Sequence, residues 1–239
     1  MKIKNIKKTK RLYYFVLIAF ILSIAYSIYM ITRAPSEDVN TLTRQKSDYV
    51  LMLLQCVLGL VAMHLPDMLN KSFHVRIPTN TIISYLIFLY AAIVLGEVRS
   101  FYYRYEHWDT VLHAFSAGML GSLGFDVVNF LNKSDTIKMQ LSPFFVALFA
   151  FCFAISIGVL WEIYEFTFDG LLGLNMQKFR LEDGTNLIGR LALEDTMDDL
   201  IIDCIGAFVT STIGYFAIVH YKKHIESKLN DENININKE

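Results

Sequence analysis

The stretch 142–166 reads SPFFVALFAFCFAISIGVLWEIYEF and decides the fold class. From Pro143 to Trp161 it holds nineteen residues without a charge. As a helix, that length covers about 28 Å at ~1.5 Å per residue, close to the ~30 Å hydrocarbon core of a bilayer. Two carboxylates, Glu162 and Glu165, then follow within one turn. The stretch therefore predicts a membrane-spanning helix that ends on ionisable side chains.

Five other apolar segments have a similar length, so the fold class that we predict is all-α, a polytopic membrane bundle of about six transmembrane helices. The composition agrees: 54% of the 239 residues are hydrophobic and 19% are charged, against about 25% charged in a typical soluble domain. Pro66 is expected to end the second span. The predicted spans lie near 12–32, 48–65, 80–98, 108–131, 142–166 and 198–220.

The distribution of Lys and Arg predicts the orientation. A basic head, 1–11, precedes the first span, and no small-residue cleavage site follows that span, so we interpret it as a retained signal anchor. With the N-terminus inside, cytoplasmic segments carry 14 of the 22 Lys and Arg and outer segments carry 8. The positive-inside rule then predicts that both termini, including a polar tail at 221–239, are cytoplasmic in a multi-pass plasma (inner) membrane protein.

The longest loop, 167–197, joins the fifth and sixth spans and lies outside in this topology. Loops of this length are often functional. Because leucines punctuate it, we expect it to fold back over the bundle as a lid, with a short interfacial helix near 186–194.

Charge and cysteine content exclude other classes. A net charge of −1 argues against a nucleic-acid binder. The three cysteines, Cys56, Cys152 and Cys204, fall in three separate apolar runs, which does not indicate a disulfide framework. We interpret them as small core residues.

Small residues recur at four-residue steps in two spans. They are Ala114, Gly118 and Ser122 in the fourth span, and Gly206, Thr210 and Gly214 in the sixth. Small residues at this spacing allow helix backbones to approach closely in lipid. These two spans are therefore expected to pack tightly against a neighbour and are candidates to pack against each other. The alternative is that glycine is simply common in membrane helices.

Ligand-type side chains recur at one face of the membrane. Residues three or four apart share a helix face, so each of three spans presents a stripe of such groups. Alternating topology brings the start of the fourth span, the end of the fifth and the start of the sixth to the outer side, together with Glu97. The stripes are Asp109 and His113, then Glu162 and Glu165, and finally Asp195, Asp199 and Asp203.

Seven carboxylates cannot remain mutually repelling anions at membrane depth. Arg99 and Arg104 are the nearest expected cations, and two arginines do not balance the set. Oxygen ligands and one imidazole suit a divalent ion such as Mn²⁺, Fe²⁺, Mg²⁺ or Zn²⁺. We predict metal ligation by Asp109, His113, Glu162, Asp195 and Asp199. The alternatives are a metal-free proton or hydrogen-bond network, and acidic residues that only complement helix dipoles.

Aromatic residues flank these carboxylates. Trp108, Trp161 and the stretch 101–105 fit an interfacial aromatic belt. The alternative is that the two tryptophans wall the predicted site.

Three motifs in this order resemble the YjdF-like family of uncharacterised bacterial inner-membrane proteins. They are WDTVLH from Trp108, WEIYE from Trp161 and DTMDDLIID from Asp195, within a resemblance that covers about 85–220. The matching positions are Asp109, His113, Glu162, Glu165, Asp195 and Asp199. The resemblance implies a compact multi-helix membrane domain and no particular reaction.

Three functions remain open on the sequence. The first is a metal-dependent enzyme acting on a membrane lipid or lipid-linked substrate, with Glu165 or Asp203 as general base. The second is a cation- or proton-coupled transporter, in which Asp126 and His64 are the polar groups that offer a path to the inner face. The third is a non-catalytic module that senses ions or supports a partner.

Overall fold

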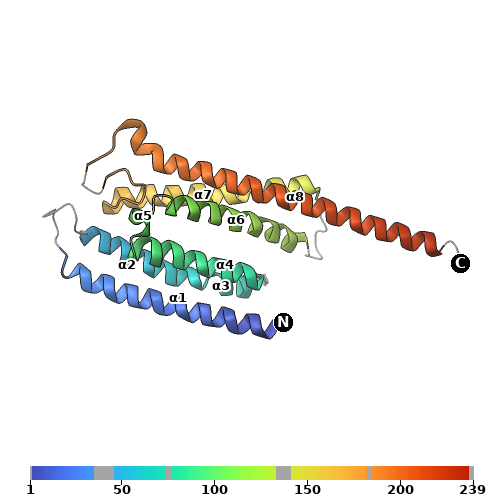
Figure 1. Ribbon diagram of the computed structural model, residues 1–239, viewed down its shortest axis with the longest axis horizontal. Helices are drawn as coiled ribbons and strands as arrows, with labels where there is room; N and C mark the ends of the chain where they lie inside the picture. Colours follow the sequence, from blue (N-terminus) through green and yellow to red (C-terminus); the bar gives the residue numbers. More distant parts are fainter. Residues whose placement is uncertain (1, 35–45, 74–76, 133–140, 182–184, 237–239) are drawn as a thin grey trace.

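The computed structural model describes residues 2–34, 46–73, 77–132, 141–181 and 185–236, and its regular elements are all helical (Figure 1). Within these ranges, η1 is a π-helix, η2 is a 3-10 helix and one isolated bridge joins Arg180 and Asn186. The predicted all-α class is confirmed. In chain order the elements are α1 (Lys2–Ile31), α2 (Lys46–Met63), α3 (Leu65–Phe73), α4 (Thr79–Leu89), η1 (Tyr90–Val98), α5 (Phe101–Arg104), α6 (Trp108–Asn132), α7 (Pro143–Leu172), η2 (Gly189–Leu193) and α8 (Glu194–Ile236).

Six helical segments of the described chain are long and apolar enough to cross a bilayer, as predicted. The second combines α2 with α3, and the third combines α4 with η1. The second span does not end before Pro66 as expected. Helix α2 ends at Met63, but after a single turn residue, His64, the apolar segment continues as α3. Pro66 does not prevent this, because it falls in the first turn of α3, where a missing N–H costs no helical hydrogen bond.

The helices form two groups that run side by side (Figure 1). In one group α1 packs against α2 and α4, and in the other α6, α7 and α8 pack together. The groups meet mainly where α4 and η1 contact α6. The chain ends lie toward one end of the bundle, and the loop from α7 to α8 lies at the other (Figure 1). An even number of spans requires this arrangement, and the cytoplasmic location of the termini stays a prediction.

Small residues bring α6 and α8 into close contact. A Cβ atom placed on Gly206 would lie 2.9 Å from the Cβ of Ala117, and one placed on Gly121 would lie 3.0 Å from Cγ2 of Thr210. The first approach is too short for an added methyl group, and the second would accept one only if Thr210 shifted by a few tenths of an ångström. The expectation that these two spans pack tightly is confirmed, and they pack against each other. Because His113 lies one turn before Ala117, the contact also sets the distance between the acidic stripes.

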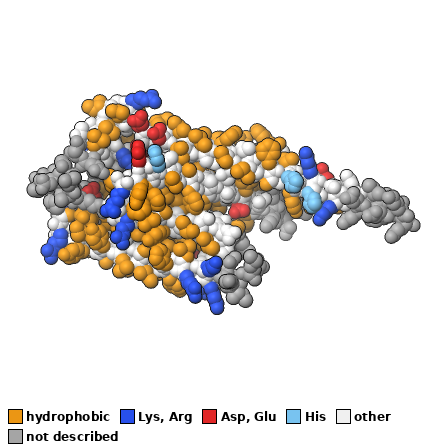
Figure 2. Space-filling view, in the orientation of Figure 1, with side chains coloured by type: hydrophobic (Ala, Val, Ile, Leu, Met, Phe, Trp, Pro, Cys, Tyr) orange, Lys and Arg blue, Asp and Glu red, His pale blue; other side chains and the backbone are white. Residues whose placement is uncertain are grey.

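Apolar side chains cover most of the outer surface, as a bilayer requires. Figure 2 shows hydrophobic side chains along the bundle and acidic ones gathered near the α7–α8 loop. The exposed fractions of Phe144 and Phe208 are 66% and 63%, far above those of soluble core residues. All three cysteines are free, but only Cys56 is buried, so our core interpretation is wrong for Cys152 and Cys204, which face outward.

Local hydrogen bonds shape the segment after α7. Gly173 ends the helix in the left-handed conformation, at φ 67°. The Asp169 carboxylate accepts hydrogen bonds from the backbone N–H groups of Met176 (2.7 Å) and Gln177 (3.0 Å). The short 3-10 helix η2 falls within 186–194, where we expected an interfacial helix, and α8 starts directly after it, four residues before the predicted span. Residues 182–184 of the predicted lid lie outside the described residues.

Candidate functional site

Three of the predicted ligands converge where α6 and α8 begin. One ligand atom each from Asp109, His113 and Asp199 lie within 4.8 Å of one another. The Nε2 atom of His113 is 3.6 Å from Oδ2 of Asp199 and 3.8 Å from Oδ1 of Asp109. These separations are too long for hydrogen bonds, which have N···O distances near 2.9 Å. The imidazole nitrogen thus faces a small gap between two carboxylates.

Asp203 contacts the other side of the same imidazole. Its Oδ1 atom is 3.3 Å from Nδ1 of His113, and its side chain is buried. Gly158 on α7 makes room for it, because a Cβ atom there would collide with the Asp203 carboxylate. Asp203 was predicted as a candidate base. Its position is that of a carboxylate that orients a histidine through the ring nitrogen opposite the gap.

Glu162 is buried without a hydrogen-bond partner. Its exposed fraction is 4%, and neither carboxylate oxygen has a partner among the described residues. It lies within electrostatic range of His113, Asp109 and Asp203. A buried, unpartnered carboxylate costs free energy unless it is protonated or binds a cation. Of the predicted residues, Glu162 is the one whose surroundings call most strongly for an added group.

Lys178 supplies the positive charge that we assigned to arginines. Its ammonium group forms ion pairs with Asp109 and, at 2.8 Å, with Asp195. Arg99 and Arg104 are instead exposed. Burial lowers the pKa of Lys178, but the charges of Asp109 and Asp195 outweigh burial and raise the pKa above its ordinary value. Asp195 therefore binds a lysine and lies outside the closest group of ligands.

The backbone of Lys178 adopts an uncommon conformation. Its φ of 47° lies in the left-handed region, which costs a non-glycine residue ~1–2 kcal/mol. The segment is held by the hydrogen bonds of Asp169 described above, and Gln177 donates a 2.7 Å hydrogen bond to Thr196 on α8. In the sequence, Lys178 appears only as one lysine within the long loop 167–197. Its insertion between two carboxylates depends on backbone geometry that hydropathy does not report.

Tyr102 walls the site where sequence reasoning expected only an aromatic belt. Its ring centroid is 5.9 Å from Nζ of Lys178. The ring fills the space beside Gly96, where any Cβ atom would collide with it. Burial and the nearby carboxylates raise the pKa of Tyr102 well above its ordinary value, so the phenol remains neutral near pH 7. The ring of Trp108 also borders the site, and its centroid lies 5.0 Å from the centroid of the Phe101 ring.

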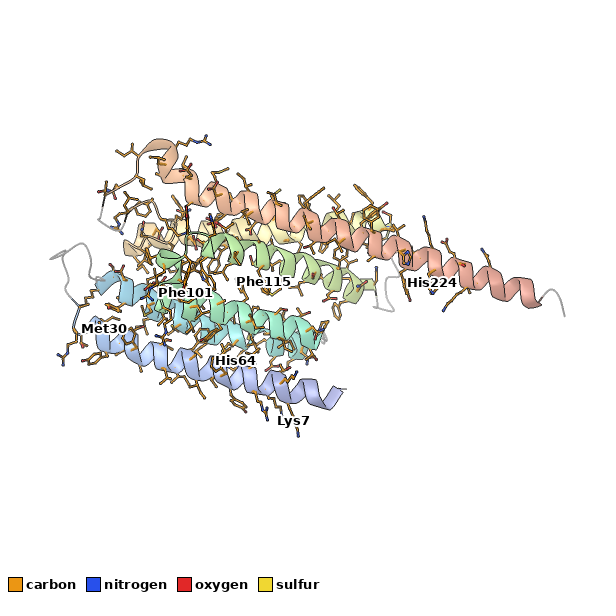
Figure 3. The ribbon with its side chains drawn as sticks, in the orientation of Figure 1. Lys7, Met30, His64, Phe101, Phe115 and His224 are labelled. Carbon is orange, nitrogen blue, oxygen red and sulfur yellow. The ribbon has the colours of Figure 1, made fainter. Side chains whose placement is uncertain are left out.

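A cavity of about 650 Å³ runs from this site between the two helix groups. Glu165, the other predicted base, and Glu97 line its polar end, where Glu97 is buried. Figure 3 shows Phe101 at this end of the bundle and Phe115 further along α6. The Phe115 ring stacks on the ring of Phe88 in α4, with 6.2 Å between their centroids. This contact joins the two helix groups beside the cavity.

The fold and this buried cluster define an integral membrane protein with six candidate spanning helices and an acidic and histidine site at one end. The chain belongs to the family described as "Predicted membrane protein (DUF2238)", which matches residues 11–220. This agrees with the resemblance found in the sequence, although the match carries no YjdF name. An uncharacterised protein of Thermotoga maritima is 31% identical over 153 residues, which cover 63% of this chain and 69% of that protein. No solved structure matches the chain.

Proposed function

We propose that this protein is a metal-dependent membrane enzyme that acts on a lipid or lipid-linked substrate. The observation that carries the metal site is the gap beside Nε2 of His113. Ligands at ~2.1 Å from a tetrahedral ion lie ~3.4 Å apart. The distances of 3.6 and 3.8 Å to Asp199 and Asp109 are close to that value and too long for hydrogen bonds.

The residues divide into distinct roles in this proposal. Asp109, His113 and Asp199 hold the ion, and the unpartnered Glu162 is the further ligand. Asp203 orients His113 through Nδ1, which makes it a positioning residue rather than a base. Asp195 holds Lys178, and Lys178 offsets the negative charge of Asp109.

Glu165 is the general base in this proposal. It lies one turn beyond Glu162 on α7 and lines the polar end of the cavity. A divalent ion would polarise a substrate oxygen and lower the pKa of a water molecule. Glu165 would accept the proton from the nucleophile, and the neutral Tyr102 beside Lys178 would help to exclude bulk water.

Transport of a cation or proton is less well supported. Such a path needs polar groups along its length, whereas the cavity beyond the cluster is lined mainly by Leu, Ile, Phe and Met side chains. His64, one of the two polar groups considered for a path, is exposed and its ring nitrogen contacts Tyr13. An apolar cavity suits a hydrocarbon better than an ion.

The metal content of the purified protein in detergent tests the site. We expect about one divalent ion per chain, lost in Asp199→Asn and Glu162→Gln. Asp198→Asn is the matched control, because Asp198 is exposed and adjacent to Asp199. Folding is checked by circular dichroism. If all four proteins contain the same amount of metal, or none binds any under supplementation, the proposed centre is wrong.

A second experiment tests the reaction. The protein is incubated with a bacterial lipid extract, and lipids that decrease or appear are followed by mass spectrometry. Glu165→Gln should keep its metal and lose the conversion. Conversion that persists in this variant would exclude Glu165 as the base, and metal binding without any conversion would favour the non-catalytic module.

A further inference from the structure

Polarity changes from one end of the cavity to the other. At the site end, Asp109, His113, Glu165 and Lys178 line it. At the opposite end the lining includes Leu69, Ile77, Leu123 and Phe153. An amphipathic molecule would match both ends at once, with its polar group beside the cluster and its apolar part along the cavity.

The length of the cavity matches one leaflet of a bilayer. On α6 its lining extends from Asp109 to Leu123, which are ~21 Å apart at ~1.5 Å per residue. On α7 it extends from Glu165 to Phe153, ~18 Å by the same rule. Half of a ~30 Å hydrocarbon core is ~15 Å. A lipid chain from one leaflet therefore fits along the cavity.

Small residues and internal hydrogen bonds keep the cavity open and apolar. Gly59, Ala62 and Ala92 line it, and their small size leaves room between the larger apolar side chains. Tyr85 also lines it, but its hydroxyl donates a 2.9 Å hydrogen bond to the carbonyl of Ala62. Its polar atom is thereby satisfied, and the ring contributes mainly apolar surface.

Charge at the polar end selects against an anionic head group. Seven carboxylates belong to the cluster at this end, and four of them, Glu97, Asp109, Glu165 and Asp203, line the cavity together with Lys178 and His113. A divalent ion would bring the positive charges to at most four, which four ionised carboxylates of the seven already balance, so no positive charge remains for an anionic head. The acidic set is Glu97, Asp109, Glu162, Glu165, Asp195, Asp199 and Asp203.

From these observations we infer that the cavity binds one hydrocarbon chain of a lipid without net negative charge, with its head group beside Lys178 and His113. This inference rests on the proposed function and names its substrate class. Binding the chain would hold the bonds next to the head group at Glu165, and the apolar lining would supply most of the affinity.

Depth-resolved photolabelling tests the inference. The probes are monoacyl phosphatidylethanolamines with a diazirine either at the end of the chain or next to the head group. The terminal diazirine should label the deep end, at Leu69 and Leu123, and the other should label Leu112 and Ser116 on α6. Equal labelling of outward residues such as Leu22 and Ile213 by both probes would overturn the inference, because it indicates lipid around the bundle only.

A matched pair of variants tests occupancy. Ala92→Phe fills the cavity and should reduce deep labelling by about tenfold. Ala25→Phe makes the same change at an exposed position on α1 and should leave labelling unchanged. A phosphatidylglycerol probe with the same chain should label less than the ethanolamine probe, and the reverse order would overturn the choice of head group.

Metal content, measured on the same samples, separates the two proposals. Ala92→Phe should keep its metal while it loses labelling. Intact metal with diffuse labelling in the native protein would refute the cavity inference alone. Depth-resolved labelling in a protein that never binds metal would refute the proposed metal centre and leave a lipid-binding cavity.

Discussion

Replacing Lys178 by methionine should destabilise the protein by about 2 kcal/mol. The substitution removes the charge but keeps the length of the side chain, and it leaves Asp109 and Asp195 without their shared cation. Removing one partner of a buried pair costs ~3–5 kcal/mol, and exposed pairs contribute ~0–1 kcal/mol. The side chains are 31%, 21% and 22% exposed, so the expected value lies between these limits.

The assay is thermal unfolding in detergent, followed by the fluorescence of Trp108 and Trp161. A loss of ~2 kcal/mol should lower Tm by roughly 4–8 °C in a chain of this size. The effect should be constant between about pH 6 and about pH 8. Because folding raises the pKa of Lys178, its ion pairs stabilise the fold fully at any pH below 10.5, the pKa of a free lysine. This stabilisation is lost only as the pH rises through the higher pKa of Lys178 in the folded protein.

Two controls isolate the cause. Lys223→Met removes a charge from an exposed position on α8 and should leave Tm unchanged. Lys178→Gly should be more stable than Lys178→Ala by ~1 kcal/mol, because glycine adopts the left-handed conformation without cost. If Lys178→Met unfolds at the native Tm, the ion pairs with Asp109 and Asp195 do not stabilise the fold.

Three further predictions concern packing and the loop. Gly158→Ala should displace the Asp203 carboxylate, so that metal affinity falls in a competition assay while Gly170→Ala, where an added Cβ meets nothing within 4 Å, has no effect. Gly206→Leu should destabilise the protein by ~1–3 kcal/mol because its side chain overlaps Ala117, and an unchanged Tm would contradict the described contact between α6 and α8. Asp169→Asn weakens the charge-assisted hydrogen bonds to Met176 and Gln177, so limited proteolysis should cleave the segment 173–181 faster, whereas Asp198→Asn should leave the rate unchanged.

Hydropathy predicted the spans well because a bilayer imposes their length. The stripes of Asp109, His113 and Asp199 were also predictable, since helical periodicity decides which residues share a face. The close contact of α6 with α8 followed from small residues at four-residue steps, and the two spans were already candidates to pack against each other. These features depend on regular geometry, which a periodic pattern reports directly.

Irregular geometry accounts for what the sequence did not predict. Lys178 enters the cluster through a left-handed backbone and the hydrogen bonds of Asp169, and neither leaves a periodic signal. The π-helix η1, which carries Glu97, has the apolar sequence YAAIVLGEV, and nothing in that sequence distinguishes it from an α-helix. The cavity depends on how far the two helix groups stand apart, and no single helix encodes that distance.

Helix α8 is longer than a bilayer is thick. At ~1.5 Å per residue its 43 residues extend for ~64 Å, well beyond a bilayer of ~45 Å with its head groups. Figure 1 shows this helix continuing past the rest of the bundle. Asp199 lies near one end, and the helix packs closely on α6 at Gly206 and again at Gly214. Because Asn230 is 24 residues beyond Gly206, a tilt of α8 by only ~5° at Gly206 would move Asn230 by ~3 Å, so the far end of α8 would amplify any tilt at the cluster.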